Sequence, residues 1–223
     1  MKKILAILLA GLMIASCELP DNYYSYTNAT DYLTVYSGKL YNDYGTELTV
    51  TQDNTDKAWN AEGNRFYASF DILNANYDIF LKAYYLATIK SITGPLPGEA
   101  LESAPVQVLD CNVSGGYLNI IITYYTAKDS ETPHSVNVYY SDNGSELTLS
   151  LIHSGGGESP VGLTNLDSMN AVTEVLCFPL EGLAPSGETR FLILDVDVLS
   201  KDTDGKYTSE HFSSQLYNVS VRF

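Results

Sequence analysis

Residues 65–73 read Arg-Phe-Tyr-Ala-Ser-Phe-Asp-Ile-Leu, and their alternation of apolar and polar side chains decides the fold class. Successive side chains of a β-strand point to opposite faces, so the apolar positions share one face. These positions are Phe66, Ala68, Phe70 and Ile72. A turn-forming Asn-Ala-Asn follows at residues 74–76, and the next extended run, residues 77–92, is so long that it must bend. A bent strand usually serves two halves of a small closed sheet, so this stretch predicts a β-barrel.

The residues before this stretch add a hairpin. Period-two alternation runs over residues 32–41 and resumes over residues 47–52. Between them, Asn-Asp-Tyr-Gly at residues 42–45 supplies turn chemistry, with a glycine that is free to take positive φ. About five strands within some sixty residues are typical of an OB-like barrel. We therefore expect this domain over residues 30–92.

The residues after the stretch predict a second β domain. Residues 93–104 contain two glycines and two prolines and lack strand periodicity, so we place a linker there. Seven alternating segments follow, at residues 106–111, 117–126, 135–140, 146–153, 171–180, 189–199 and 207–223. Segments at this spacing indicate a β-sandwich over residues 105–223. The predicted fold class is all-β, a small OB-like β-barrel followed by an immunoglobulin-like β-sandwich.

The first seventeen residues have the pattern of an export signal. Lys2 and Lys3 precede an apolar run, residues 4–14, that is too short to span a bilayer. Ile-Ala-Ser-Cys at residues 14–17 resembles the lipobox of bacterial lipoproteins, in which the cysteine is acylated and becomes the first residue of the mature chain. Several acyl chains anchor a protein firmly, whereas one binds only marginally. We favour lipidation of Cys17, with residues 18–29 as a tether, over an ordinary cleaved signal with an incidental cysteine.

The net charge of the chain limits the classes of partner, and the residue after Cys17 indicates the membrane to which the protein is delivered. The formal charge is −15, and removal of Lys2 and Lys3 with the signal makes it −17. This charge argues against nucleic acid, whose affinity comes from Lys and Arg, and against docking on anionic lipid headgroups. Glu18 is not the aspartate that commonly retains lipoproteins at the inner membrane. We therefore expect the outer membrane, with the leaflet left open.

The order of these features resembles the NigD-like lipoprotein family. The resemblance is carried by the lipobox, the hairpin over residues 32–52, the strands at residues 65–73 and 77–82, and the later run over residues 108–120. It covers nearly the whole mature chain, but its motifs are strand patterns and not catalytic signatures. It implies an OB-like barrel followed by a β-sandwich. An immunity role is attached to that family without an established mechanism, and the resemblance supplies no functional residues.

Two cysteines remain once Cys17 is acylated. An oxidising compartment permits a disulfide between Cys111 and Cys177, which would close a loop of about 67 residues and stabilise the fold by roughly 4 kcal/mol on the chain-entropy model. The alternative, which we favour, is that both are small buried apolar side chains on separate strands.

Two motifs imitate catalytic or metal-binding chemistry. The glycine-rich residues 154–160 follow His153 and suggest a serine hydrolase, but a nucleophile elbow needs glycine two residues to either side of the serine, and Val161 takes the second place after Ser159. Asp-Thr-Asp-Gly at residues 202–205 imitates the start of an EF-hand loop, yet His211 stands where the bidentate glutamate belongs. A flexible loop and a hairpin turn are the favoured interpretations.

The remaining titratable residues indicate no cofactor or metal. His134, His153 and His211 are far apart in the sequence and lack metal-ligand spacing. His153 ends an apolar strand face, where a hydrogen-bonded structural histidine is the common outcome. Asp195 and Asp197 alternate on one strand face as paired carboxylates do, but solvation of that face is the favoured role.

Aromatic residues give the only hint of a binding surface. Trp59, the only tryptophan, lies in a polar stretch between two predicted strands, where OB-like barrels often present binding loops. Tyr44 and Tyr67 would complete a neutral aromatic platform with it if the fold brings the rings together. The alternative, which we favour, is that Trp59 packs onto the end of the barrel.

The sequence thus predicts a non-enzymatic, lipid-anchored envelope protein. We expect it to contact the membrane through the lipid on Cys17 and to bind an unknown protein partner, in an immunity-like or complex-accessory role. A surface lipoprotein that binds glycans through exposed tyrosines and Trp59 is the second hypothesis, and a hydrolase is the third. Neighbouring tyrosines send one ring to each side of an extended chain and would serve either of the first two hypotheses. Cross-strand stabilisation of an exposed sheet is the favoured interpretation of these tyrosines.

Overall fold

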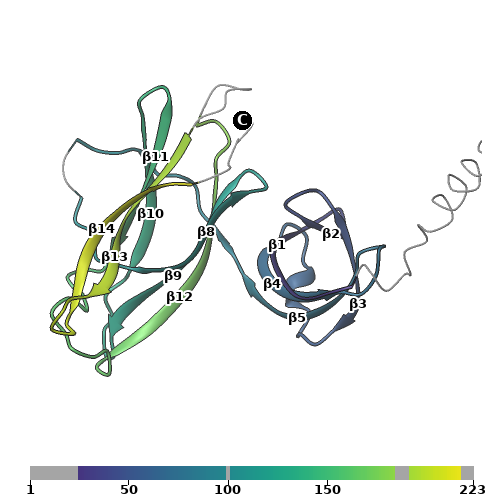
Figure 1. Cartoon of the computed structure of the whole chain (residues 1–223), viewed down its shortest axis with the longest axis horizontal. Helices are drawn as coiled ribbons and strands as arrows, with labels where there is room; N and C mark the ends of the chain where they lie inside the picture. The colour runs from purple at the N-terminus through teal and green to yellow at the C-terminus, as the bar shows by residue number, and fades with distance from the viewer. Residues whose placement is uncertain (1–24, 99–100, 184–190, 217–223) are drawn as a thin grey trace, which may run out of the picture.

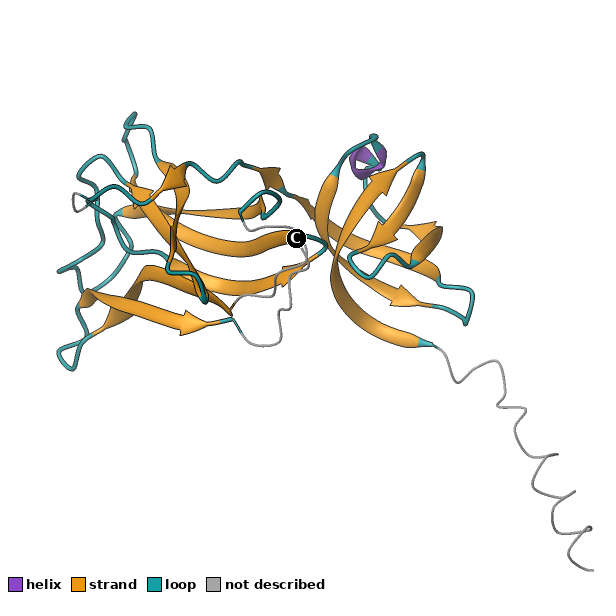
Figure 2. Ribbon diagram, turned by 90° about the horizontal axis from the view of Figure 1, so that it is seen from above, coloured by secondary structure: helices purple, strands orange, loops and turns teal. Residues whose placement is uncertain are grey.

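The computed structural model describes residues 25–98, 101–183 and 191–216, which form two β domains side by side (Figure 1). The signal, Cys17 and most of the expected tether lie outside the described residues. The helical content of the described part is one 3₁₀ turn (Ala58–Asn60), drawn at the end of the barrel in Figure 2. No helix in those three ranges is long and apolar enough to cross a membrane. The expected all-β class is confirmed.

The first domain is a closed five-stranded barrel. Its strands are β1 (Tyr26–Tyr36), β2 (Lys39–Asn42), β3 (Glu47–Asp53), β4 (Arg65–Ile72) and β5 (Asp78–Leu86). They close in the order β1-β2-β3-β5-β4, and β3 and β5 run parallel. This is the OB-like arrangement that the sequence predicts. Alternate residues of β4 point into the barrel core, together with residues of the other four strands and Trp59. The core contains Leu33, Val35, Leu40, Leu48, Trp59, Phe66, Ala68, Phe70, Ile79 and Leu81.

The second domain is a sandwich of two sheets. Its longer strands are β8 (Gln107–Ser114), β9 (Tyr117–Ala127), β10 (Ser135–Asp142), β11 (Glu146–Ser154), β12 (Met169–Pro179), β13 (Phe191–Lys201) and β14 (Tyr207–Gln215). Two short strands, β6 (Thr88–Ile89) and β7 (Gly94–Pro95), complete sheets of order β14-β13-β11-β10-β7 and β6-β12-β9-β8. Alternate residues of these strands fill the core, among them Leu118, Ile120, Ile122, Leu147, Leu149, Leu151, Leu192 and Leu194. Residues 219–223, expected to end the last strand, lie outside the described residues.

The domain boundary lies earlier in the chain than the sequence indicates. We expected the barrel to reach residue 92 and a linker at residues 93–104. Instead, β6 pairs in parallel with β12, and β7 pairs in parallel with β10, so the chain has joined the sandwich by Thr88. The long run over residues 77–92 is therefore one extended segment that serves the two domains in turn. Likewise β1 begins at Tyr26, inside the expected tether.

The expected hairpin turn at residues 202–205 is confirmed. Asp202 Oδ1 accepts hydrogen bonds from the backbone N–H groups of Asp204 and Lys206, at 2.9 Å each, and Gly205 has a φ of 78°. The turn joins β13 to β14, so its aspartates organise backbone and follow the Asx-turn pattern.

Candidate functional site at the junction of the two domains

Arg65, the first residue of β4, lies between the domains. Phe66 and Ala68 point into the barrel, so the alternation of the strand directs Arg65 outward, toward the sandwich. Its guanidinium group donates two hydrogen bonds of 2.6 Å to the two carboxylate oxygens of Asp43, and a third of 2.9 Å to Thr34 Oγ1. The side chains of Arg65 and Asp43 are only 2% and 3% exposed, so this is a fully buried bidentate ion pair.

The same guanidinium group also reaches the sandwich. It donates to Asn119 Oδ1 on β9 at 2.9 Å and, through Nε, to Cys177 Sγ on β12 at 3.3 Å. With these contacts all five N–H donors of Arg65 have partners. The rings of Tyr32 and Tyr117 lie 5.3 and 4.4 Å from the guanidinium carbon and add cation–π attraction. Arg65 therefore joins the barrel to both central strands of one sandwich sheet.

Asp43 is held from the sandwich side as well. The hydroxyl of Ser114 donates to Asp43 Oδ2. Gly115, in the turn between β8 and β9, has a φ of 58°, and a Cβ atom there would lie 2.5 Å from Asp43 Oδ1. Only glycine permits this close approach of the turn to the carboxylate. Burial alone would lower the pKa of Arg65, but its hydrogen bonds to Asp43 and the charge of Asp43 outweigh that effect and raise it.

Apolar packing beside this network completes the junction. Tyr32 from the barrel packs with Ile121, Val175 and Cys177 from the sandwich, and Tyr67 lies against this cluster. The rings of Tyr32 and Tyr67 are 5.1 Å apart. A buried ion pair and an apolar cluster on the same interface hold the two domains in one relative orientation.

A groove of about 580 Å³ opens at the junction next to the apolar cluster. It is lined by Tyr67, Tyr85, Leu86, Thr88, Leu109, Ile121, Thr173, Glu174 and Val175, so both domains contribute. Tyr85, Leu86 and Leu109 are exposed despite their apolar character. The one charged residue in this lining is Glu174, which accepts a hydrogen bond from the hydroxyl of Tyr124 at 2.8 Å. Apolar grooves between domains are preferred positions for binding sites.

Trp59 packs in the barrel, which is the interpretation favoured from the sequence, and the alternative aromatic platform with Tyr44 and Tyr67 is not formed. Trp59 is buried in the barrel core, packs on Phe66 with ring centroids 5.9 Å apart, and donates its indole N–H to Asp53 at 3.0 Å. Tyr67 instead belongs to the domain junction, and Tyr44 is exposed on the turn after β2. Trp59 and Tyr67 therefore lie on opposite sides of the barrel wall, because the first points inward and the second outward.

Cys111 and Cys177 do not form the disulfide that the sequence permits, and both are free. Cys111 on β8 is paired with Ile120 on β9, and Cys177 on β12 is paired with Asn119 on the other side of β9. One strand thus separates them, which places their Cα atoms about 9–10 Å apart, beyond disulfide reach. Cys111 packs on the sandwich core, whereas Cys177 faces the junction and accepts the hydrogen bond from Arg65.

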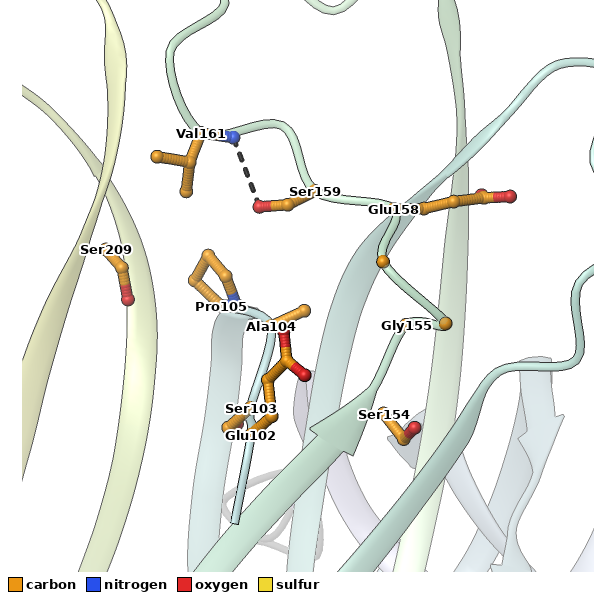
Figure 3. Close-up of a pocket in the computed structure, with 12 residues that line it drawn as sticks. Glu102, Ser103, Ala104, Pro105, Ser154, Gly155, Glu158, Ser159, Val161 and Ser209 are labelled. Carbon is orange, nitrogen blue, oxygen red and sulfur yellow. Dashed lines mark hydrogen bonds between the residues drawn. The ribbon is translucent and has the colours of Figure 1, made fainter. Parts of the chain in front are cut away.

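A second hollow, of about 320 Å³, lies beside the glycine-rich loop at residues 154–160 (Figure 3). Ser159 Oγ accepts a hydrogen bond of 3.3 Å from the backbone N–H of Val161, which is the geometry of a turn. The ring nitrogens of His153 are engaged elsewhere, with Ala104 O at 3.3 Å and with His134 at 3.0 Å. No imidazole thus activates the hydroxyl of Ser159 among the described contacts.

The structure brings together two histidines that the sequence does not connect. Ala104 O, His153, His134 and Glu158 form a hydrogen-bonded chain, with His134 Nε2 3.3 Å from Glu158 Oε2. Tyr124 stacks on His134 with ring centroids 5.3 Å apart. The chain ties β11 to the two loops that flank the hollow.

The histidine pair predicts a loss of stability in mild acid. Burial, with the neighbouring charge of His134, lowers the pKa of His153 to about 4. The unfolded chain takes up this proton near pH 6.5, so folding stability is complete above that pH and falls as the pH drops toward 4. We expect this group to lower the melting temperature by roughly 5 °C over that interval. Calorimetry of His153→Gln should show a shallower fall, whereas His211→Gln should not, because the raised pKa of His211 gives it the opposite pH dependence and places that dependence at higher pH.

His211 forms the third histidine site, on the outer face of the sandwich. Its ring nitrogens lie 2.9 Å from Asp195 and 3.2 Å from Asp197. The hydrogen bond to Asp197 and the charge of Asp195 raise the pKa of His211. Both aspartates thus contact His211. Nowhere in the described part of the chain do three or more His, Cys, Asp or Glu residues gather to hold a metal ion.

The fold and the junction define a class, a two-domain all-β protein in which an OB-like barrel is fixed to a β-sandwich. Solved structures share this fold over most of both chains. One is a NigD-like immunity protein from Bacteroides caccae, which is 18% identical, with 86% of this chain and 99% of that chain covered and a TM-score of 0.58. The resemblance to the NigD-like family is confirmed at the level of the fold.

Two further structures extend the comparison. A protein of unknown function, DUF1344, from Bacteroides vulgatus is 21% identical, with coverages of 87% and 93% and a TM-score of 0.60. A candidate lipoprotein from Bacteroides fragilis is 12% identical, with coverages of 86% and 97% and a TM-score of 0.50. No protein-family profile and no curated protein matches the sequence.

Proposed function

We propose that this chain is a non-enzymatic, lipid-anchored envelope protein that binds a protein partner in the groove at the domain junction. The observation that carries the proposal is the groove itself, an apolar surface built from both domains. Exposed Tyr85, Leu86 and Leu109 gather there, whereas monomeric proteins usually scatter such residues singly. Tyrosine beside apolar side chains is also the composition of interface hot spots.

Rigidity supports the same proposal. Hydrogen bonds from Arg65 to Asn119 and Cys177, and from Ser114 to Asp43, fix the two walls of the groove relative to each other, so binding costs little ordering of the protein. The lipid on Cys17 would hold this surface at the envelope, in the outer membrane on the reasoning from Glu18. An immunity-like role fits a protein that holds a partner without turnover, and the name of the Bacteroides caccae structure supports it.

Glycan binding is the second candidate, favoured by the exposed rings of Tyr26, Tyr36, Tyr44 and Tyr77. Stacking on sugars needs such rings together with polar groups that bind the hydroxyls. These four tyrosines lie outside the junction groove. The groove, with one carboxylate in a mostly apolar lining, suits a protein surface better.

Tyr85→Ser is expected to weaken capture of the partner at least tenfold, because a central tyrosine at an interface contributes roughly 2 kcal/mol or more. The measurement is quantitative pull-down from envelope extract with the wild-type chain and the variant. Tyr36→Ser is the matched control, since Tyr36 and Tyr85 are both 67% exposed. Identical sets of captured proteins for all three chains, or saturable binding of a purified glycan that Tyr85→Ser leaves intact, would contradict the proposal.

A further inference from the structure

We infer that the free edge of β8 receives an extended segment of the protein partner, which pairs with it as an added strand. The inference rests on the proposed function and deepens it, because β8 forms one border of the junction groove through Leu109. In this mode of recognition, backbone hydrogen bonds provide affinity and pockets for alternate side chains provide specificity.

The first observation is the unpaired edge. β8 is the last strand of its sheet and pairs with β9 from Gln107 to Ser114. Its other side is bridged only at the preceding residue, Val106, whose backbone bonds to β13 at 3.0 and 2.8 Å. Past Val106, no described residue pairs with the outer edge of β8. The backbone N–H and C=O groups of that edge are therefore available to another strand.

The second observation is that an apolar groove lies on each side of the same edge strand. The junction groove contains Ile121 and Val175, which point toward the barrel. A larger groove, of about 800 Å³, is lined by residues 107–111 and by Leu194, Val198, Leu199, Phe212, Ser214 and Leu216. It lies on the opposite side of the sheet, because Val108 and Cys111 pack on the sandwich core. Alternate side chains of an added strand would enter the two grooves in turn.

Leu109 lies where the two grooves meet. The register of β8 against β9 shifts between Val108 and Asp110, so Leu109 is the extra residue of a β-bulge. It is 60% exposed and lines both grooves. A bulge with an adjacent charge usually protects an edge strand from unwanted pairing. Protection of the edge from unwanted pairing does not account for a large exposed leucine or for an apolar groove on each face. Recognition of a partner strand accounts for the leucine and for both grooves.

The charged residues that line the two grooves indicate which kind of segment binds there. The charged residues lining the two grooves are Asp110 and Glu174, and neither lining contains Lys or Arg. The chain as a whole carries −15. An incoming strand with alternating apolar side chains and basic ends complements this surface, and an acidic strand is repelled. The proposed occupant is therefore an extended, alternating, basic segment of the partner.

The test uses the synthetic peptide KVTVTVTK, capped at both ends, with the full acylated chain in non-ionic detergent. We expect saturable binding, and amide hydrogen exchange over residues 107–114 slowed at least tenfold in the complex. Leu109→Ser should weaken binding at least tenfold. Phe191→Ser is the matched control, because Phe191 is also 60% exposed and lines neither groove. It should bind as the wild type does.

Several results would overturn the inference. Equal binding of EVTVTVTE would remove the charge argument, and equal binding of KVTPTVTK, whose proline lacks an N–H, would remove strand pairing. Amide exchange over residues 107–114 that the peptide leaves unchanged would also rule out strand pairing. If the amides of residues 107–114 are already protected from exchange in the free chain and dilution removes that protection, the edge pairs with a second copy of the chain. If deleting residues 217–223 removes the protection, the edge pairs with the chain's own end.

The outcomes also separate this inference from the proposed function. If capture of the partner depends on Tyr85 but the partner leaves exchange at β8 unchanged, the groove binds a protein and the added strand is wrong. If the peptide protects β8 while Tyr85→Ser captures the same proteins as the wild type, the added strand stands and the proposed use of the groove is wrong.

Discussion

Replacement of Arg65 by alanine is expected to lower the free energy of unfolding by about 3–5 kcal/mol, because it leaves the carboxylate of Asp43 buried without a partner. The loss corresponds to a fall of roughly 10 °C in melting temperature for a chain of this length. Asn119 and Cys177 lose their contact with the barrel at the same time. Calorimetry measures the stability, and limited proteolysis between Leu86 and Val106 reports whether the domains separate.

The matched control is a second ion pair of the barrel. Lys82 and Asp71 are 2.6 Å apart, but their side chains are 29% and 16% exposed. Water screens such a pair, so Lys82→Ala should cost less than about 1 kcal/mol. The double variant Arg65→Met, Asp43→Leu, which removes both charges, should be more stable than Arg65→Ala alone. Equal melting temperatures for Arg65→Ala and Lys82→Ala would refute the assignment of Arg65 to the junction.

Cys17→Ala is expected to move the protein completely from the membrane fraction to the soluble fraction, because it removes the only proposed site of acylation. The barrel and the sandwich should keep their melting temperature, since the first strand begins at Tyr26, nine residues after the anchor. Fractionation followed by immunoblotting measures the first effect and calorimetry the second. A suitable control is Cys111→Ser, which alters a cysteine away from the lipobox and should leave membrane association unchanged. A Cys17→Ala chain that still sediments with membranes would show that another feature anchors it.

Local sequence was sufficient for most of the fold. The alternation over residues 65–73 predicts which residues of β4 enter the barrel core, and the same period predicts the segments that form β9 and β11. The turn at residues 202–205 followed from Asx and glycine chemistry. The boundary between the domains was predicted too late, because the run over residues 77–92 has the same extended pattern on both sides of Ala87. Periodicity reports that a strand is extended and does not report which sheet it joins.

The candidate site was predicted poorly for a related reason. A large ring in a polar stretch makes Trp59 a candidate for binding, but Asp53 satisfies its indole and the barrel buries it, as the favoured packing interpretation has it. The sequence shows Arg65 only as part of a strand pattern, because an arginine at the start of a strand normally faces solvent. No local signal distinguishes a buried arginine from an exposed one when its acceptors are remote.

The sequence by itself therefore determined the strands, their apolar faces and the lipobox pattern, since each depends on residues close together in the chain. Tertiary structure alone decided the junction and the histidine pair. Arg65 meets partners that are 22, 54 and 112 residues away, and His134 meets His153 across 19 residues. These contacts exist only because barrel closure and sheet order bring distant strands to one place. Burial then turns residues that are usually exposed into an ion pair and a hydrogen-bonded chain.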